Sequence, residues 1–182
     1  MKYDVVIIGG GLSGMTAGLE LQRKGFRTIA VAEGLSMHET PRKAYTEAGG
    51  ILLSGDSVLG GTFSGDTLTS VRTRNLGETR LEADHFILAT GKYYGGGLVS
   101  TEDRIYEPVF GCDVSYDPDR SRWCVRDFFA RQPFENFGVR VDGDFHVYIN
   151  GQTIRNLYAV GEVLEGNVDI VETAEAVCRR LQ

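Results

Sequence analysis

Cysteine is scarce in this sequence, and its placement excludes the common metal and disulfide frameworks. The three cysteines are odd in number and widely spaced, at Cys112, Cys124 and Cys178. There is no C-x-x-C pair and no cluster of His and Cys, so neither a disulfide framework nor a zinc or iron–sulfur site is predicted. A reducing, cytoplasmic setting is the simplest interpretation.

Long apolar runs and an excess of basic residues are also missing. No run reaches the roughly 18 residues that a membrane-spanning helix needs, and Asp4 directly before the first apolar run argues against a signal peptide. The formal net charge of −6 argues against a general surface for nucleic acid or for an anionic membrane. At 182 residues, 42% of them hydrophobic, the chain is predicted to form a single domain over residues 1–182.

Glycine, by contrast, is concentrated at the start of the chain. Residues 4–18 are DVVIIGGGLSGMTAG: a short apolar run typical of a strand buried on both faces, and then Gly9, Gly11 and Gly14 in G-x-G-x-x-G spacing. In such a motif the first glycine permits a tight turn, the second lets a pyrophosphate approach, and the third lets the helix pack on the sheet. The free N–H groups at the start of that helix, predicted over residues 12–24, would face the phosphates.

The second predicted strand, residues 28–32, strengthens this interpretation. It ends in Glu33 and Gly34, and Glu33 follows Gly14 by 19 positions, where an acidic residue is expected to hold the hydroxyls of an adenosine ribose. The context of strand, glycine turn, helix and acidic residue favours a dinucleotide site over an ordinary glycine-rich turn. Ser13 either donates to a phosphate or simply starts the helix.

The remaining pattern predicts an α/β, Rossmann-like FAD/NAD(P)-binding fold: a parallel sheet with an inserted antiparallel β-meander. The expected elements are a solvated surface helix in 37–48 within a short 34–49 connection, a parallel strand at 51–53, a three-stranded meander over 56–82, buried parallel strands at 85–89 and 157–160, a hairpin over 139–149 and a last helix at 166–181.

Further candidate residues follow the predicted strands. The carboxyl ends of parallel strands share one edge of an open α/β sheet, and ligands bind there. Val58 begins the meander, where it would meet an adenine through its backbone or point into the core. The others are Ala89, Thr90 and Gly91 after one strand, and Gly161 and Glu162 after another.

No catalytic residue is assigned. His38, His85 and His146 have no evident carboxylate partner by spacing; His85 is expected to be structural and His146 to point to solvent. The phenylalanines of residues 127–137 are predicted to pack in the core or in an interface, because basic residues do not interleave them regularly.

These residues resemble the two-dinucleotide-binding-domain flavoproteins, through the N-terminal motif, Glu33, LEADHFILATG at 81–91 and TIRNLYAVGE at 153–162. In that superfamily the last block lies against the ribitol of FAD and usually ends in Asp, where this chain has Glu162. Longer blocks, such as GGILLSGDSV and RIYEPVFGCDV, are similar to the family of the B subunit of the bacterial anaerobic glycerol-3-phosphate dehydrogenase.

The second resemblance implies a flavin-dependent oxidoreductase. Hydride would leave C2 of sn-glycerol 3-phosphate to give dihydroxyacetone phosphate. The implied partners are a sister catalytic subunit and an iron–sulfur subunit. The iron–sulfur subunit would pass electrons to quinone and hold the assembly at the inner membrane. The resemblance associates the B subunit with FMN, whereas Glu33 and the glycine motif suit an adenosine diphosphate, which FMN lacks. FAD is therefore favoured, with FMN as the alternative.

The sequence also departs from that family. Its members carry a large inserted cap domain where this chain has only the 34–49 connection, and they are about twice as long. The chain alone is therefore expected to bind flavin poorly and not to turn over. A non-catalytic module that keeps the fold for docking to a partner is the alternative, with the segment from Tyr93 to Phe137 as its docking surface.

Overall fold

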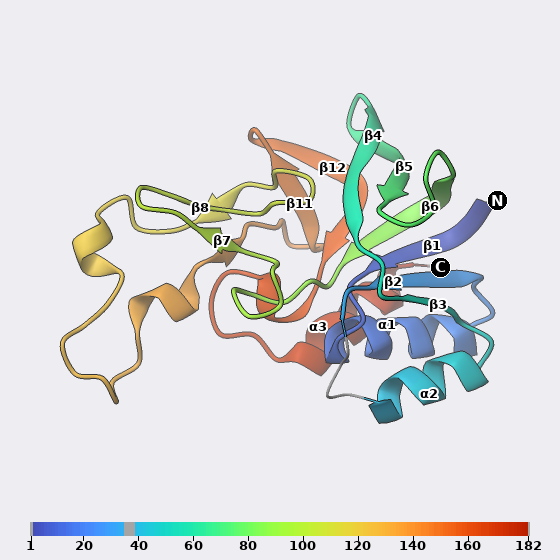
Figure 1. Ribbon diagram of the computed structural model, residues 1–182, viewed down its shortest axis with the longest axis horizontal. Coiled ribbons are helices and arrows are strands. Elements are labelled where there is room, and N and C mark those ends of the chain that lie inside the picture. Colours follow the sequence, from blue (N-terminus) through green and yellow to red (C-terminus); the bar gives the residue numbers. More distant parts are fainter. Residues whose placement is uncertain (1, 35–38, 182) are drawn as a thin grey trace.

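The computed structural model describes residues 2–34 and 39–181. At its centre is a sheet whose parallel strands lie in the order β12, β6, β1, β2, β3. Their bounds are β1 Lys2–Ile8, β2 Thr28–Ala32, β3 Ile51–Ser54, β6 Arg80–Leu88 and β12 Gln152–Ala159. Figure 1 shows the helices below the sheet in that view: α1 Leu12–Arg23, α2 Glu39–Glu47 and α3 Ile170–Arg180. The predicted α/β fold is confirmed.

Strand β1 lies in the middle of the sheet because its side chains suit burial on both faces. It pairs in parallel with β2 on one side and with β6 on the other, with Val5 opposite Thr28 and His85. Val5 and Ile7 are fully buried, and each such side chain contributes about 1.5–3 kcal/mol relative to an exposed one. The glycine motif therefore starts at the carboxyl end of the central strand.

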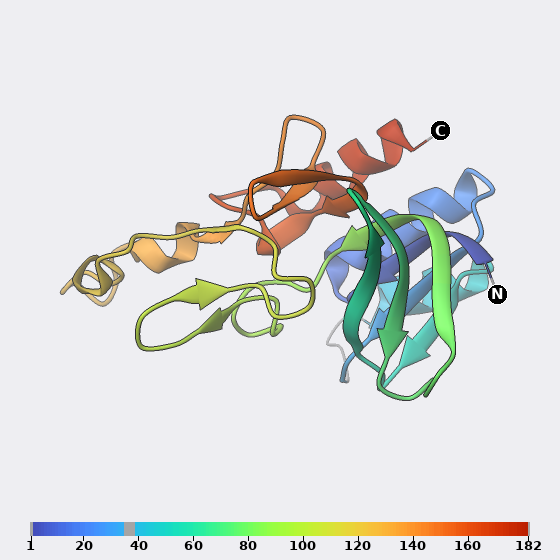
Figure 2. The ribbon, with the colours of Figure 1, turned by 90° about the horizontal axis from the view of Figure 1, so that it is seen from above.

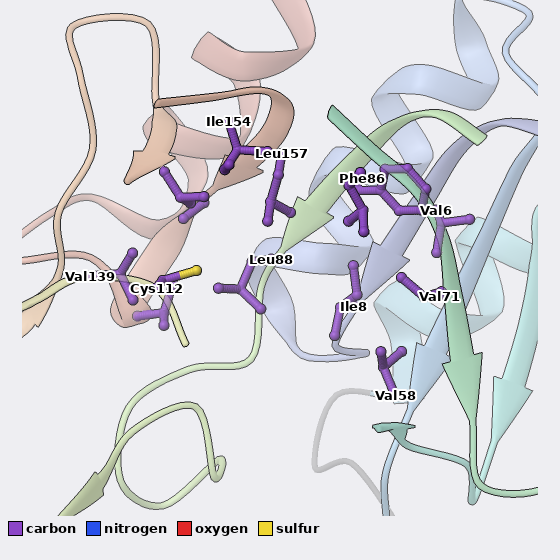
Figure 3. Packing of buried hydrophobic residues seen from close by; sticks show 14 of the residues in the cluster. Val6, Ile8, Val58, Val71, Phe86, Leu88, Cys112, Val139, Ile154 and Leu157 are labelled. Carbon is purple, nitrogen blue, oxygen red and sulfur yellow. The ribbon is translucent and has the colours of Figure 1, made fainter. Parts of the chain in front are cut away.

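The core has two layers, one on each face of this sheet. Val5 and Ile7 pack on the side of the helices, with Met15 and Leu21 of α1. On the opposite face, Val6 and Ile8 point toward the antiparallel strands, as Figure 3 shows for their packing with Phe86, Leu88 and Val71. The period of two along a strand assigns alternate residues to these two layers.

The antiparallel part differs in one respect from its prediction. Strands β4 Val58–Ser64 and β5 Thr67–Thr73 form a hairpin, and β5 continues the meander by pairing with β6. The third meander strand and the buried strand expected at 85–89 are a single strand, β6. No glycine or proline stands between Leu81 and His85, so nothing interrupts the extended chain.

Helix α2 is not the purely solvated helix that the sequence predicted. Most of its side chains are at least partly exposed, but Tyr45 is fully buried against the layer of α1. Gly18 and Gly50 make room for this ring, because a Cβ on either glycine would approach the Tyr45 ring within 3 Å. Residues 37 and 38 of the expected helix lie outside the described residues.

Between β6 and β11 His146–Ile149 the chain leaves the sheet and returns. We call residues 92–139 the arm; Figure 2 shows it extending away from the strands. It contains two short antiparallel pairs, β7 Val99–Ser100 with β8 Ile105–Tyr106 and β9 Val114–Ser115 with β10 Gly138–Val139, and the 3-10 helices η1 Arg120–Arg122 and η2 Pro133–Asn136. Trp123 is its buried centre and stacks edge-on with Tyr116 and Phe137.

The phenylalanines of the arm do not share one environment. Phe137 is buried and Phe134 partly buried, as expected for core residues. Phe128 and Phe129 are 87% and 94% exposed. The expectation of core packing is therefore wrong for these two residues, and their packing in an interface stays a prediction.

The last part of the chain follows its prediction with shifted bounds. A bridge joins Val141 to Val147, but the main partner of β11 is β12. Helix α3 begins at Ile170, because the Asp169 carboxylate accepts the N–H groups of Val171 and Glu172 and so caps the helix there. No helix among residues 2–34 and 39–181 is long and apolar enough to cross a bilayer.

His146 does not point freely into solvent. Its Nδ1 lies 3.1 Å from the Asp142 carboxylate, and its ring stacks on Tyr158 with centroids 4.6 Å apart. The carboxylate partner that spacing alone did not reveal is four residues away. His85 packs on the same tyrosine, with ring centroids 6.0 Å apart, as expected for a structural residue.

Acid should weaken the fold partly through His85. Burial lowers the pKa of this imidazole, against the attraction of Asp84, and His146 lowers it further while Asp4 raises it. The unfolded chain then takes up a proton that the folded chain resists, so His85 contributes stability above pH 6.5 that is lost as pH falls below it. The difference in unfolding free energy between the native chain and His85→Gln should shrink in that window, as urea titrations from pH 7.5 to 5 would show. A constant difference would contradict this.

Candidate functional site

The site is built at the edge where the parallel strands end. Hydrogen bonds extend the sheet past each strand, from Gly9 N to Val31 O (2.9 Å), Ala89 N to Ile8 O (2.8 Å) and Val160 N to Leu88 O (3.0 Å). The segments that follow β1, β6 and β12 are thereby held side by side. The structure thus brings the glycine motif, Thr90–Gly91 and Gly161–Glu162 to one edge.

The three motif glycines have different surroundings. Gly9 has φ +118°, and a Cβ on it would overlap the Ala89 carbonyl. A Cβ on Gly14 would overlap the Gly9 carbonyl, so the helix rests directly on the loop. A Cβ on Gly11 would meet nothing within 4 Å. Of the three motif glycines, only Gly11 therefore borders open space. Open space is what the middle glycine of the motif needs if a pyrophosphate is to approach it.

The start of helix α1 offers donors without competing anions. Gly11 is its N-cap, no side chain caps this end, and the first turn holds no acidic residue. The first N–H groups of a helix have no acceptor inside it, and the helix dipole adds partial positive charge. This end is suited to an anion such as a diphosphate.

Ser13 does not cap this helix. It is the second residue of α1 and is 8% exposed. A Cβ on Gly161 would overlap its hydroxyl oxygen, so Ser13 packs against the segment after β12. It joins the glycine loop to the end of β12.

Arg42 is a neighbour of this loop that sequence reasoning missed. From α2, its Nε donates to the Gly10 carbonyl (3.0 Å) and its Nη1 to the Gly34 carbonyl (3.3 Å). It ties the glycine loop to the segment after β2 and adds positive charge there. One arginine on a polar helix carries no local signal of this role, because the position of the helix depends on tertiary contacts such as the burial of Tyr45.

The adenosine end of the predicted site contains a second unforeseen arginine. Glu33 is exposed, and its Oε1 pairs with Arg74 Nη2 at 2.7 Å. The Arg74 N–H donates to the Ser57 carbonyl, directly before Val58, which is 7% exposed. Glu33, Val58 and Arg74 thus lie together, although they come from three separate segments.

A buried aspartate supports this corner. Asp56 is 3% exposed, and its Oδ1 accepts the N–H groups of Ser57 and Asn75, at 2.8 and 3.0 Å. It therefore fixes the two turns that carry Val58 and Arg74.

The segment after β6 folds back on itself at the edge. Gly91 has φ +70°, and a Cβ on Gly97 would overlap the Gly91 carbonyl, so residues 91–97 form a tight turn. The Thr90 hydroxyl oxygen is buried and has no partner among the described residues. An unpartnered hydroxyl at a ligand edge is a candidate for contact with a bound group.

Glu162 and Lys92 both lie beside this turn, close enough for their charges to interact. Gly161 has φ +74° and donates its N–H to Thr173 Oγ1 at 3.0 Å, which directs the chain into α3. The Glu162 carboxylate is exposed and lies near Gly91. Burial lowers the pKa of Lys92 while Glu162 raises it, and the Lys92 ammonium donates to the carbonyls of Glu135 and Gly166.

A family model described as "FAD binding domain" matches residues 4–40 and 34–178 of the chain. The chain belongs to this family. FAD is thus the cofactor that the comparison supports, in agreement with the open space at Gly11, the uncapped helix end and the unpartnered Thr90 hydroxyl.

Curated relatives of this FAD-binding chain carry a more specific name. The B subunit of the anaerobic glycerol-3-phosphate dehydrogenase of Vibrio cholerae serotype O1 is 38% identical over 141 residues, which are 76% of this chain and 32% of that protein. The protein of the same name from Vibrio vulnificus is 42% identical over 142 residues, with the same coverage. The match thus spans about a third of the length of these relatives, and it bears out the resemblance seen in the sequence.

Solved structures support the fold. The crystal structure of an oxidoreductase from Agrobacterium tumefaciens is 13% identical with a TM-score of 0.58, over 98% of this chain and 96% of that one. A thioredoxin reductase from Gloeobacter violaceus is also 13% identical, with a TM-score of 0.57, over 99% and 93%. Together with the family match and the relatives' names, the chain stands among the flavoprotein oxidoreductases.

Proposed function

We propose that this chain is the flavin-binding core of a subunit of an anaerobic glycerol-3-phosphate dehydrogenase. The observation that carries the proposal is the open space at Gly11, at the junction of the glycine loop and an uncapped helix end, in a chain of the FAD-binding family. The names of the curated relatives supply the substrate class. The whole enzyme would oxidise sn-glycerol 3-phosphate to dihydroxyacetone phosphate and pass the electrons to quinone.

In this proposal FAD lies along the carboxyl edge of the sheet. The N–H groups at the start of α1 bind the diphosphate, and Arg42 holds the loop that presents them. Glu33 bonds the adenosine ribose, with the Val58 backbone beside the adenine. Ala89, Thr90 and Gly91 border the ribitol from β6, and Gly161 and Glu162 from β12.

FAD supplies the acceptor for hydride in such an oxidation. This chain's own residues bind and orient the cofactor; we assign no catalytic residue and expect no turnover from the chain alone. Its partners would be a sister catalytic subunit and an iron–sulfur subunit. Through them the chain would lie on the cytoplasmic side of the inner membrane.

An absorbance spectrum of the purified chain with added FAD or FMN tests the cofactor directly. Bands near ~450 nm that remain after desalting would support the proposal, and the released cofactor would distinguish FAD from FMN. Because the chain alone is expected to bind weakly, flavin is also titrated to high concentration without desalting, and absence of binding to either flavin under those conditions would overturn the proposal. The chain would then be better described as a scaffold that keeps the flavoprotein fold for docking.

Glu33→Gln should distinguish the two flavins further. We expect about a tenfold loss of FAD affinity, because an exposed carboxylate that bonds the ribose contributes about 1.4 kcal/mol, and no change in FMN affinity, because FMN has no adenosine. Isothermal titration with both flavins measures this, with the exposed Glu78→Gln as a matched control. Equal losses for FAD and FMN would show that Glu33 does not bind the ribose.

A further inference from the structure

The strongest unexplained feature of the surface is a pair of phenylalanines at the tip of the arm. Phe128 and Phe129 are 87% and 94% exposed, and their rings contact each other edge-on with centroids 5.4 Å apart. Val125, three residues earlier, is 46% exposed. A contiguous apolar patch in water is costly, and such patches commonly mark an interaction site.

The loop that carries these rings is well organised. The Ala130 N–H donates to the Asp127 carbonyl (3.2 Å), and the Phe129 N–H donates to Asp127 Oδ1 (3.0 Å), so residues 127–130 form a closed turn. The Gln132 side chain spans the base of this turn, since it accepts from Val125 N and donates to the carbonyls of Asp127 and Ala130. The phenylalanines are therefore presented outward by a built turn.

Two arginines flank the pair in the sequence. Residues 120–131 contain four arginines and one acidic residue, although the whole chain has a net charge of −6. Within the described part of the chain, Arg126 and Arg131, which flank the phenylalanines, have no hydrogen bond, ion pair or ring contact. Because salt screens charges beyond about 8 Å, the potential at the rings is set by the charges of this turn, which are the cations of Arg126 and Arg131 and the one carboxylate of Asp127.

The shape of the tip determines which partner fits. In Figure 1 the loop between η1 and η2 lies at the end of the arm, on the side away from the sheet. A stable protein interface needs about 800 Å² of matched surface per partner, which a convex turn with two exposed rings does not offer. A lipid surface needs no matching pocket: aromatic rings enter the interfacial region, and arginines bind anionic headgroups.

We propose that the segment from Val125 to Arg131 is a membrane-contact loop, which inserts Phe128 and Phe129 into an anionic phospholipid surface and binds its headgroups through Arg126 and Arg131. The loop would contact the membrane directly, in addition to the association through partner subunits proposed above. This contact does not depend on which flavin is bound. Two rings and two cations give weak, reversible binding, so the loop would orient an assembly that other subunits also hold.

Co-sedimentation of the full chain with vesicles tests the loop. Vesicles of phosphatidylcholine with 40% phosphatidylglycerol, at ~1–5 mM lipid, should pull down the native chain, and vesicles of phosphatidylcholine alone should do so at least tenfold less well. The double variant Phe128→Ser, Phe129→Ser should bind the mixed vesicles about 100-fold more weakly. The double variant Arg126→Gln, Arg131→Gln should lose about 30-fold and also lose its sensitivity to salt.

A matched control is available outside the arm tip. Tyr94 is fully exposed but lies in the turn after β6, so Tyr94→Ser removes an exposed aromatic ring without touching the loop. It should bind vesicles as the native chain does. Circular dichroism shows whether each variant keeps the fold. Absence of native binding to the mixed vesicles, or equal binding by the Phe128 and Phe129 variant, would overturn the proposal and leave a protein partner as the occupant.

Discussion

Gly11→Ala is expected to lower the affinity for FAD about 100-fold, a loss of about 2.7 kcal/mol, while the chain stays folded. The added methyl group meets no protein atom within 4 Å, and Gly11 has φ −80°, so alanine fits the backbone. The same methyl group would occupy the space through which a pyrophosphate approaches the N–H groups of α1. The cost in unfolding free energy should be about 1 kcal/mol or less, from the poorer N-cap.

Gly9→Ala is the matched comparison for that variant. Here the methyl group would overlap the Ala89 carbonyl, and φ is +118°, so the fold itself should lose several kcal/mol, about 2–4. Flavin titration together with urea unfolding separates the two effects. If Gly11→Ala binds FAD as the native chain does, the glycine loop is not the diphosphate site, however well the chain folds.

Tyr45→Ala is expected to lower the free energy of unfolding by about 3–5 kcal/mol, one of the largest effects of any single substitution in this chain. The ring is fully buried between α1 and β3, and its Oη bonds with Thr28 Oγ1 (2.7 Å) and donates to the Ile51 carbonyl (3.3 Å). Burial raises the pKa of Tyr45 to about 12, so the phenol stays protonated. Thermal and urea unfolding measure the loss.

Tyr45→Phe separates packing from hydrogen bonding at this position. It keeps the ring and should cost only about 1–2 kcal/mol for the lost bonds. Because Tyr45 anchors the helix that carries Arg42, the alanine variant should also weaken flavin binding more than the phenylalanine variant does. A loss below about 1 kcal/mol for Tyr45→Ala would mean that α2 is only loosely attached to α1.

The sequence predicted the parallel strands well because burial on both faces leaves a clear trace. The continuous apolar run of β1 and the span Thr28–Ala32 of β2 are found as expected. The sequence pattern predicted two strands where the structure has the single strand β6. The half of β6 that pairs with β5 alternates between polar and apolar residues, whereas the half between β1 and β12 is continuously apolar. A period of two and a continuous run can belong to one strand when its neighbours change along its length.

The candidate site was predictable only where local backbone geometry carries it. Gly9 has a positive φ, and Gly14 lies against the Gly9 carbonyl, so only glycine fits at either position. Such positions can be recognised in the sequence because they are occupied by glycine. Arg42 and Arg74 come from segments far along the chain, and nothing in their own neighbourhood distinguishes them from solvated arginines. The Asp142 partner of His146 was within four residues, yet only the turn at 142–145 brings the two groups together.

By itself the sequence determined the layered fold, the position of the glycine motif and the acidic end of β2, because hydrophobic period and glycine spacing are local properties. Only the tertiary structure decided which charges surround that motif, that Tyr45 is buried, and that two phenylalanines of one aromatic segment stand in solvent while Phe137 does not. Burial depends on what packs against a residue from elsewhere in the chain, and a single sequence without its fold does not specify those neighbours.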